Sequence, residues 1–309
     1  MNNLYVIVPY FNYNNNPYSF ANLQLLLDSE FEECVKIVLV EGILDGQSPL
    51  SNLPKSIYKH MVFNLPNKIW VQHNLINLAL RNLEDWQYAA WMDRDIVFTD
   101  PLWASKVIRK LKNGVDILQP FSECVFLNKD MQPCPEETST FFPLAEEGNA
   151  DFKIISYMKS LKDDIKCDKK TLYRHPGQTW AISKSFFQKI DGIFDKGILG
   201  ANDMITCLMI DQSQGLANYY SVLFKLEYFL KKFKFGRPNF DYLDGLIFHR
   251  THGSTGKRKY YSRYFMLLND PSFNSSLDIA YTNEGVVCLT QRGLRFSEEI
   301  ELYFSERAD

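Results

Sequence analysis

The sequence lacks several features that would assign the protein to a familiar class. No run of about 18 consecutive apolar residues is present, which is the length that a membrane-spanning helix needs. The start, MNNLYVIVPYF, lacks the basic segment and long apolar run of a secretory signal. The six cysteines form no C-x-x-C pair and have no zinc-type spacing. These absences predict reduced thiols, a cytoplasmic location and no membrane span.

Glycine-rich phosphate-binding loops are missing as well. Neither G-x-x-x-x-G-K-[ST] nor G-x-G-x-x-G follows the first predicted strand, and VPYFNYNNN stands where such a loop would be. This argues against a P-loop enzyme and against an ordinary dinucleotide-dependent dehydrogenase. It also disfavours a nucleotidyltransferase, because those enzymes normally carry a glycine-rich loop near the N-terminus.

The composition is that of a globular protein. The 309 residues are 46% hydrophobic and 23% charged, and the length suffices for one large domain or two. The net charge of −3 argues against a general nucleic-acid binder. However, ten Lys and Arg stand against three acidic residues between 225 and 263, a local charge of +7. This basic stretch indicates either an anionic partner, from a diphosphate to a polynucleotide, or a solvated helix face with a charged loop.

Apolar strands alternate with amphipathic stretches in the first part of the chain. This alternation predicts an α/β fold with a mostly parallel central sheet and helices on both faces. Ligands of such sheets bind beyond the carboxyl ends of the strands, where Tyr10, Glu41 and Asp93 are expected. The predicted strands are 4–10, 36–41, 60–65, 88–92 and 116–121, and the predicted helices are 18–30, 69–83 and 102–112.

The second half of the chain is less regular. Residues 122–172 read as irregular, and a loop of that length in a compact domain is usually functional or mobile. Residues 177–190 predict a strand followed by a helix, and 245–249 a short strand. Further helices are predicted at 202–212, 214–235 and 258–268, and the tail predicts two strand-like pieces and a helix at about 297–307.

One short segment, YAAWMDRDIVF, carries the strongest indication of chemistry. An apolar strand ends there in Asp93 and Asp95, separated by Arg94. Two such carboxylates repel each other and are costly to bury unless a cation lies between them. Mg²⁺ or Mn²⁺, bound by one or two carboxylates and by substrate phosphates, would meet this need. The alternative is a turn with Arg94 as the local counter-ion.

Four segments together resemble a known enzyme family. AAWMDRDIVF resembles the Asp-x-Asp strand end of glycosyltransferases with the GT-A fold, and IWVQHNLINLAL resembles their helix with a family asparagine, here Asn77. HPGQTWAISKSFFQKIDGIFDKGILGANDM resembles their acceptor-side segment. LIFHRTHGSTGKRKYYSR resembles an H-x-x-H-G…R-x-Y-x-x-R pattern of bacterial and viral predicted GT-A enzymes. The chain departs from the pattern at Asn202 and Asp203, where an acidic pair is usual, and in VQHN, which is often more charged.

The resemblance implies a domain organisation and an activity. Residues 1–270 are expected to form a GT-A (Rossmann-like) catalytic domain, with a nucleotide-sugar-binding half at 1–121 and an acceptor half at 122–270. Residues 271–309 are expected to form a C-terminal extension packed on it. The implied activity is metal-dependent transfer of a sugar from a nucleotide-diphosphate sugar to a hydroxyl group. A UDP-sugar is the expected donor, and Mn²⁺ or Mg²⁺ the expected cofactor.

Site residues follow from the resemblance together with side-chain chemistry. Asp203 is the expected general base, and a single base without an enzyme nucleophile implies inversion at the anomeric carbon. Alternatively, Asp203 caps the following helix, Trp180 is a packed core residue, the histidines are structural, and Arg258 belongs to a solvated helix start. The predicted donor-binding residues are Pro9, Tyr10, Glu41, Asn77, Asp93, Arg94 and Arg258. The predicted metal ligands are Asp93, Asp95, His249 and His252, and the predicted acceptor contacts are Trp180 and Asn202.

The acceptor is the least determined part of this prediction. The basic stretch with interleaved aromatic residues fits a nucleic-acid groove, where phosphates meet cations and a flipped base stacks on rings. Enzymes that this chain resembles include transferases that add sugars to hydroxymethylated bases in DNA, so the resemblance implies a hydroxymethylated pyrimidine in DNA as the favoured specific acceptor. The alternatives are a saccharide, lipid or protein hydroxyl, and a protein that binds a nucleotide-sugar without turning it over.

Overall fold

The computed structural model describes a large part of the chain, and the predicted helices 214–235 and 258–268 lie outside that part, as do His252 and Arg258. No helix among the described residues is long and apolar enough to cross a membrane. The described residues are 2–44, 46, 48–50, 53–133, 177–200, 202–203, 206, 238–251, 270 and 272–307.

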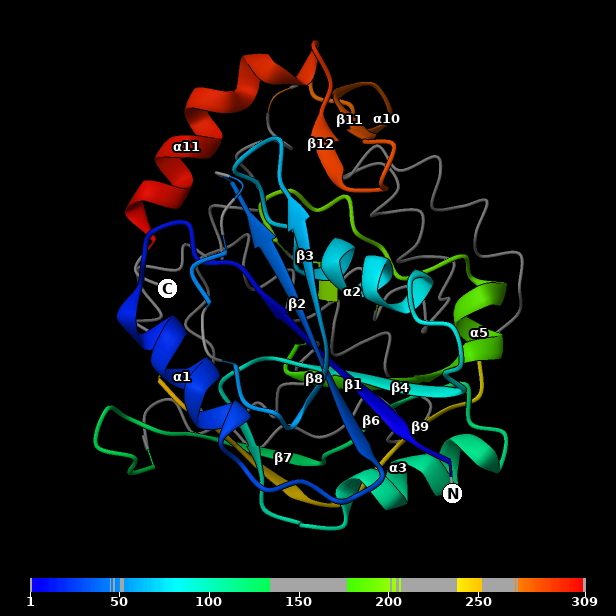
Figure 1. Cartoon of the computed structure of the whole chain (residues 1–309). Coiled ribbons are helices and arrows are strands. Elements are labelled where there is room, and N and C mark those ends of the chain that lie inside the picture. Colours follow the sequence, from blue (N-terminus) through cyan, green and yellow to red (C-terminus); the bar gives the residue numbers. More distant parts are fainter. Residues whose placement is uncertain are drawn as a thin grey trace, which may run out of the picture.

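A seven-stranded sheet in the order β3-β2-β1-β4-β8-β6-β9 forms the centre of the described structure (Figure 1). Strand β8 runs antiparallel to both of its neighbours, β4 and β6, and all other pairs in this sheet are parallel. The prediction of an α/β fold with a mostly parallel sheet is confirmed. The strands are β1 (Leu4–Tyr10), β2 (Val35–Ile43), β3 (Ile57–Asn64), β4 (Tyr88–Met92), β6 (Ile117–Gln119), β8 (Thr179–Ser183) and β9 (Phe240–Tyr242).

Helices cover both faces of this sheet, as the sequence predicts. Alternate residues of a strand point to opposite faces, and on β1 Tyr5 and Ile7 belong to one apolar cluster while Val6 and Val8 belong to the other. The first cluster includes buried residues of α2 (Gln72–Arg81) and α5 (Lys184–Lys189). The second includes those of α1 (Pro17–Leu27) and α3 (Trp103–Lys112).

A second, three-stranded sheet in the order β5-β10-β7 lies beside the first. It consists of β5 (Ile96–Phe98), β7 (Glu123–Phe126) and β10 (Leu246–His249). Strand β10 is antiparallel to β5 and parallel to β7. Of these strands the sequence predicted only β10, from the apolar run at 245–249, and it did not predict β5 and β7. This sheet brings two distant parts of the chain to the end of β4.

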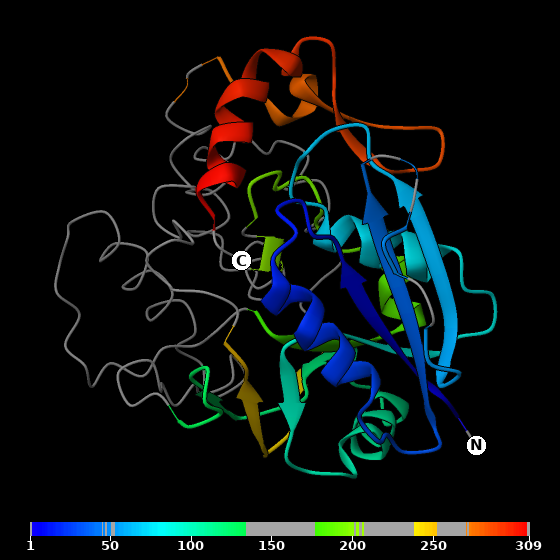
Figure 2. The same cartoon turned by 60° about the vertical axis from the view of Figure 1, so that its left-hand side comes forward.

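The C-terminal residues form a small unit beyond the tips of β2 and β3 (Figures 1 and 2). The two strand-like pieces and the helix predicted for the tail are present. Tyr303 donates a hydrogen bond from its hydroxyl to the Leu199 carbonyl at 3.1 Å, which ties this unit to the main body. The elements are α10 (Ser275–Asp278), β11 (Ile279–Tyr281), β12 (Val287–Leu289), the 3-10 helix Gly293–Phe296 and α11 (Ser297–Glu306).

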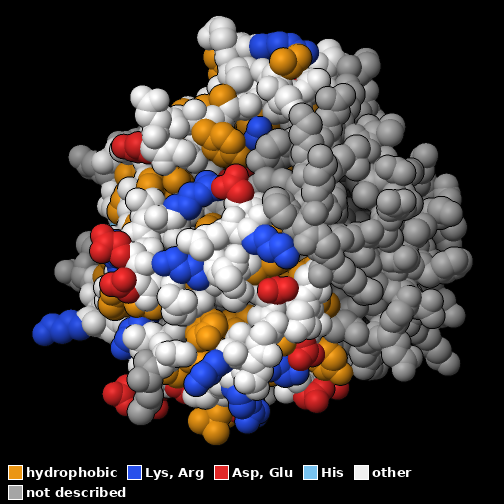
Figure 3. Space-filling model, turned by 90° about the vertical axis from the view of Figure 1, so that its right-hand side faces the viewer, with side chains coloured by type: hydrophobic (Ala, Val, Ile, Leu, Met, Phe, Trp, Pro, Cys, Tyr) orange, Lys and Arg blue, Asp and Glu red, His pale blue; other side chains and the backbone are white. Residues whose placement is uncertain are grey.

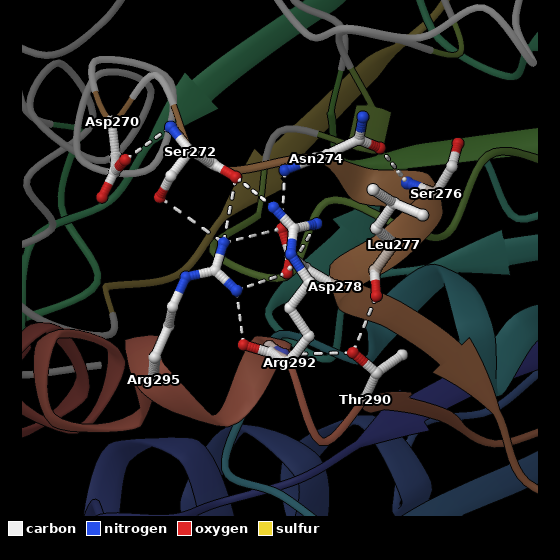
Figure 4. Close-up of polar contacts among 10 residues, drawn as sticks. Asp270, Ser272, Asn274, Ser276, Leu277, Asp278, Thr290, Arg292 and Arg295 are labelled. Carbon is white, nitrogen blue, oxygen red and sulfur yellow. Dashed lines mark hydrogen bonds and ion pairs between the residues drawn. The ribbon is translucent and has the colours of Figure 1, made fainter.

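A buried carboxylate organises the C-terminal unit (Figure 4). The Asp278 side chain is 0% exposed and lies 2.8 Å from Nη1 of Arg295 and 3.3 Å from Nη1 of Arg292. It also accepts a hydrogen bond from the backbone N–H of Asn274 at 2.6 Å. Two guanidinium groups and a backbone donor thus compensate for the loss of hydration of this carboxylate.

Gly293 in this unit has no room for a side chain. An added Cβ atom would overlap the backbone carbonyl oxygen of Asp278 and lie 3.0 Å from its carbonyl carbon. Since both are backbone atoms, we expect Gly293→Ala to lower the free energy of unfolding by about 1–3 kcal/mol. Gly245→Ala is the matched control, because no heavy atom of the described structure lies within 4 Å of an added Cβ there. Denaturant titrations that give both variants the same midpoint would contradict this packing.

Candidate active site

Asp93, Arg94 and Asp95 form a turn between β4 and β5. The Asp93 N–H donates to the backbone carbonyl of Gln178 at 2.9 Å, and the Ile96 N–H donates back to the Asp93 carbonyl at 3.2 Å. The first bond holds the turn against the residue that precedes β8, and the second closes the turn itself. The Asp95 side chain is buried, whereas Asp93 remains partly exposed. Both aspartates therefore lie where a parallel sheet binds ligands.

His249, which the sequence predicts as a metal ligand, lies beside Asp95. The antiparallel pairing of β10 with β5 places His249 opposite Ile96, the residue after Asp95. The Nε2 atom of His249 is 3.6 Å from Oδ1 of Asp95, and both side chains are at least 95% buried. The imidazole also packs on Phe126, with 4.6 Å between the ring centroids. A carboxylate and an imidazole thus face each other across two strands.

This pair suits a divalent cation, since carboxylate oxygens are preferred ligands of Mn²⁺ and Mg²⁺ and imidazole nitrogen is an accepted one. Among the residues that the structure describes, no three His, Cys, Asp or Glu side chains are grouped closely enough to hold a metal ion. Of the four predicted metal ligands, Asp95 and His249 lie close together, and His252 lies outside the described residues. The fourth, Asp93, accepts a hydrogen bond at Oδ1 from the side-chain amide of Gln72.

Negative charge is concentrated around Asp93. The pKa of Asp93 is raised to about 8: burial of the carboxyl group contributes most, the carboxylates of Asp95 and Asp203 also raise the pKa, and Arg94 and the Gln72 hydrogen bond lower it. Carboxylates from two separate segments therefore act on one another at this edge of the sheet. A divalent cation bound there would relieve this repulsion.

A tight turn delivers Asp203 to this edge. The side chain of Asn202 is buried, and its amide accepts from the Gly197 N–H at 2.7 Å and donates to the Gly197 carbonyl at 3.2 Å. Asn202 and Asp203 are helical, and the Thr206 hydroxyl donates to the Asn202 carbonyl at 2.9 Å. The structure thus gives Asn202 a role in shaping the turn, and its contact with an acceptor stays a prediction.

The ends of β1 and β2 form the neighbouring part of the edge. Tyr10 and Glu41 lie opposite each other in the β1–β2 register, and Pro9, Tyr10 and Glu41 are all buried. Oε2 of Glu41 accepts from the Ser48 hydroxyl at 2.6 Å and lies 3.0 Å from Nε2 of His60. Oε1 of Glu41 is buried and has no hydrogen-bond partner among the described residues. A ligand group that donates a hydrogen bond would satisfy this oxygen.

Two other predicted site residues are engaged with the protein itself. The Asn77 amide donates to the Ile193 carbonyl at 2.7 Å and to Asp195 at 3.0 Å, and accepts from the Ile193 N–H at 3.0 Å. Trp180 is 1% exposed and lies opposite Trp91 in the β4–β8 pairing. These contacts favour structural roles over the donor contact predicted for Asn77 and the acceptor contact predicted for Trp180.

Sequence reasoning missed three polar residues that the structure brings to this edge. Gln72, at the start of α2, holds Asp93, and Gln178 holds the backbone of Asp93 from a left-handed conformation with φ 85°. Such backbone strain in a residue other than glycine is often found at functional sites. Arg250 is the third, and its position directly after the predicted ligand His249 was the available signal.

No family model matches the chain, and no curated protein matches its sequence. Several solved structures are similar to it. Staphylococcus aureus TarS in complex with UDP-GlcNAc covers 84% of this chain at 12% identity and a TM-score of 0.44, and this chain covers 60% of that one. For Mycobacterium tuberculosis glucosyl-3-phosphoglycerate synthase with Mn²⁺, UDP and phosphoglyceric acid, the match covers 87% of this chain and 77% of that one, at 10% identity and a TM-score of 0.42.

A Drosophila galactosyltransferase mutant in complex with manganese, UDP-Gal and xylobiose matches 68% of this chain and 61% of its own, at 11% identity and a TM-score of 0.33. The chain spans about three fifths of the length of the TarS structure. All three likenesses are distant, so function is inferred below from the side chains of this chain.

Proposed function

We propose that the protein is a metal-dependent glycosyltransferase that moves a sugar from a nucleotide-diphosphate sugar to an acceptor hydroxyl. The observation that carries the proposal is the meeting of Asp95 and His249, 3.6 Å apart, at the carboxyl edge of a mostly parallel sheet. A hard cation held by so few protein groups keeps coordination positions for phosphate oxygens. The absence of a glycine-rich loop from the sequence supports phosphate binding through a cation instead.

Each group at this edge has a role in the proposed reaction. Asp95 and His249 would hold a divalent cation, which would supply Lewis-acid stabilisation of the departing diphosphate. Glu41 receives a hydrogen bond from the nucleoside at Oε1, the buried oxygen that has no partner among the described residues. Tyr10 lines the same position from the end of β1. Gln72 fixes the orientation of Asp93 toward the donor.

Asp203 acts as the general base in the transfer step. A bond forms between the acceptor oxygen and the anomeric carbon while the bond from that carbon to the leaving phosphate oxygen breaks. The acceptor proton moves to the Asp203 carboxylate, and the nucleoside diphosphate leaves with the bonding electron pair. Electrostatic interaction between Asp203 and Asp93 supports placing the base at the same edge as the donor. One base without an enzyme nucleophile corresponds to inversion at the anomeric carbon.

A panel of nucleotide-sugars tests the proposed activity. The protein is incubated with each donor in the presence of Mn²⁺, and the released nucleotide is identified by chromatography. We expect a nucleoside diphosphate from at least one donor and a loss of this release when excess chelator is added. Release of pyrophosphate would instead mark a nucleotidyltransferase, and donor binding without release a non-catalytic binder.

For the acceptor, the sequence favours a hydroxymethylated pyrimidine in DNA over a saccharide, lipid or protein hydroxyl. This part of the proposal rests on the basic stretch 225–263, of which the structure describes 238–251. On the face in Figure 3, Lys and Arg side chains alternate with Asp and Glu over the described residues. Transfer of labelled sugar to hydroxymethylated duplex, with binding that falls steeply with salt, would support it. The same weak binding to modified and unmodified duplex, without transfer, would remove it.

A further inference from the structure

Arg250 is a buried cation with unused hydrogen-bond donors. Its side chain is 9% exposed, and its Nε and Nη1 atoms are buried without a hydrogen-bond partner among the described residues. A guanidinium group loses hydration when it is buried, and this loss is tolerated when its N–H groups and its charge are met by other groups. A ligand that accepts hydrogen bonds from Nε and Nη1 of Arg250 would therefore satisfy these two buried donors.

Hydrogen bonds to the backbone fix the place of Arg250 in the structure. The Arg250 N–H donates to the Asp95 carbonyl at 2.8 Å, so the residue is attached directly to the Asp-x-Asp turn. On either side of it, the His249 carbonyl accepts from the Leu127 N–H at 2.8 Å, and the Thr251 carbonyl accepts from the side-chain amide of Asn22 at 3.0 Å. The Asp95 carboxylate also acts electrostatically on the Arg250 guanidinium. Arg250 therefore stays beside the expected cation site.

Other arginines of the same protein have their donors engaged. Arg295 donates to Asp278 at 2.8 Å and to the Ser272 carbonyl at 2.9 Å (Figure 4). Arg307 donates to the Tyr303 hydroxyl and lies over the ring of Trp70, 4.5 Å from its centroid. Unmet donors are thus not a general property of the arginines in the described structure, whether exposed like Arg295 or buried like Arg307. Arg94, between the two aspartates, shares the property at Nε.

We propose that Arg250 binds the diphosphate group of the sugar donor, next to the cation at Asp95 and His249. The inference rests on the proposed function and adds to it a phosphate-binding residue. The planar guanidinium fork matches two phosphate oxygens, which a lysine ammonium cannot engage in the same bidentate way. Because Arg250 adjoins His249 in the chain and Asp95 in space, an anion bound to the cation lies within its reach. Among the described residues, Arg250 thus takes the donor-binding role that the sequence predicts for Arg258.

Calorimetric titration of the Mn²⁺-loaded protein tests this assignment. The probes are UDP, GDP, ADP, CDP and dTDP, and the tightest of them is then compared with its own nucleoside by NMR. We expect Arg250→Gln to weaken binding of the diphosphate about 10- to 100-fold and Arg250→Lys to weaken it less. Affinity for Mn²⁺ and for the nucleoside should stay unchanged. Arg109→Gln, an exposed arginine of α3, should bind the diphosphate as the wild type does.

Thermal unfolding separates this role from a structural one. Because the Nε and Nη1 donors of Arg250 make no hydrogen bond among the described residues, we expect Arg250→Gln not to lower the melting temperature of the ligand-free protein. Arg295→Gln, which loses the contacts to Asp278, should lower it. Equal diphosphate affinity in the wild type and both Arg250 variants would overturn the inference and leave the proposed function standing. A wild type that binds none of the five diphosphates in Mn²⁺ would overturn both.

Discussion

Asp95→Asn is expected to reduce the release of nucleoside diphosphate by at least about 1,000-fold. Asparagine keeps the size of the side chain but removes the charge that holds a cation against His249, which lies 3.6 Å away. In the proposed reaction, this cation would stabilise the charge that develops on the leaving diphosphate. The measurement is the rate of diphosphate release in Mn²⁺ with the best donor of the panel.

Asp100→Asn is the matched control for this variant. It makes the same chemical change five residues further along, where the carboxylate pairs with Lys106 of α3 at 2.5 Å, outside the Asp-x-Asp turn. We expect wild-type activity for this variant and wild-type circular dichroism for both. Full activity in Asp95→Asn, or in wild-type protein with excess chelator, would show that the cation is not part of the reaction.

Asp203→Asn is expected to lower the rate of sugar transfer by about 100- to 10,000-fold while donor affinity stays the same. The amide of asparagine cannot take the proton of the attacking hydroxyl, whereas donor binding depends on other groups. The measurement compares the maximal rate with the dissociation constant of the donor. Until an acceptor is identified, hydrolysis of the donor serves as the reaction, since the attacking water must also lose a proton.

Asp191→Asn provides the control for the base. This residue lies in the preceding segment of the chain, its side chain is 77% exposed, and its backbone is in a left-handed conformation (φ 53°) that asparagine also adopts. It should transfer sugar at the wild-type rate. If Asp203→Asn does the same, the carboxylate is the helix cap that the sequence offers as the alternative, and the base must be sought elsewhere.

The central sheet could largely be predicted from the sequence. Its buried strands are apolar runs bounded by polar residues, and the run at 88–92 has the same bounds as β4 in the structure. The strands that were missed, β5, β7 and β9, contain three or four residues each. Their pairing partners, rather than a local pattern, determine that they are strands. The strand pairing that forms the small sheet beside the candidate site was therefore not predicted.

The candidate site could be predicted only in part, because long-range strand pairing brings some of its residues together. Asp93 and Asp95 stand out because charges at the end of an apolar strand are unusual, but the meeting of Asp95 with His249 depends on the long-range pairing of β5 with β10. Asn77 and Trp180 lie in family-like segments, yet burial and hydrogen bonding to the protein decide their surroundings. Gln72 gave no signal, because a single polar residue has no periodicity, and the signal for Arg250 was only its position directly after His249.

Diffraction at the manganese absorption edge, from crystals grown with Mn²⁺ and a nucleoside diphosphate, tests the metal assignment most directly. We predict one strong anomalous peak about 2–2.5 Å from a carboxylate oxygen of Asp95 and from Nε2 of His249. A peak bound elsewhere on the protein, or no peak near these two side chains at saturating Mn²⁺, would contradict it.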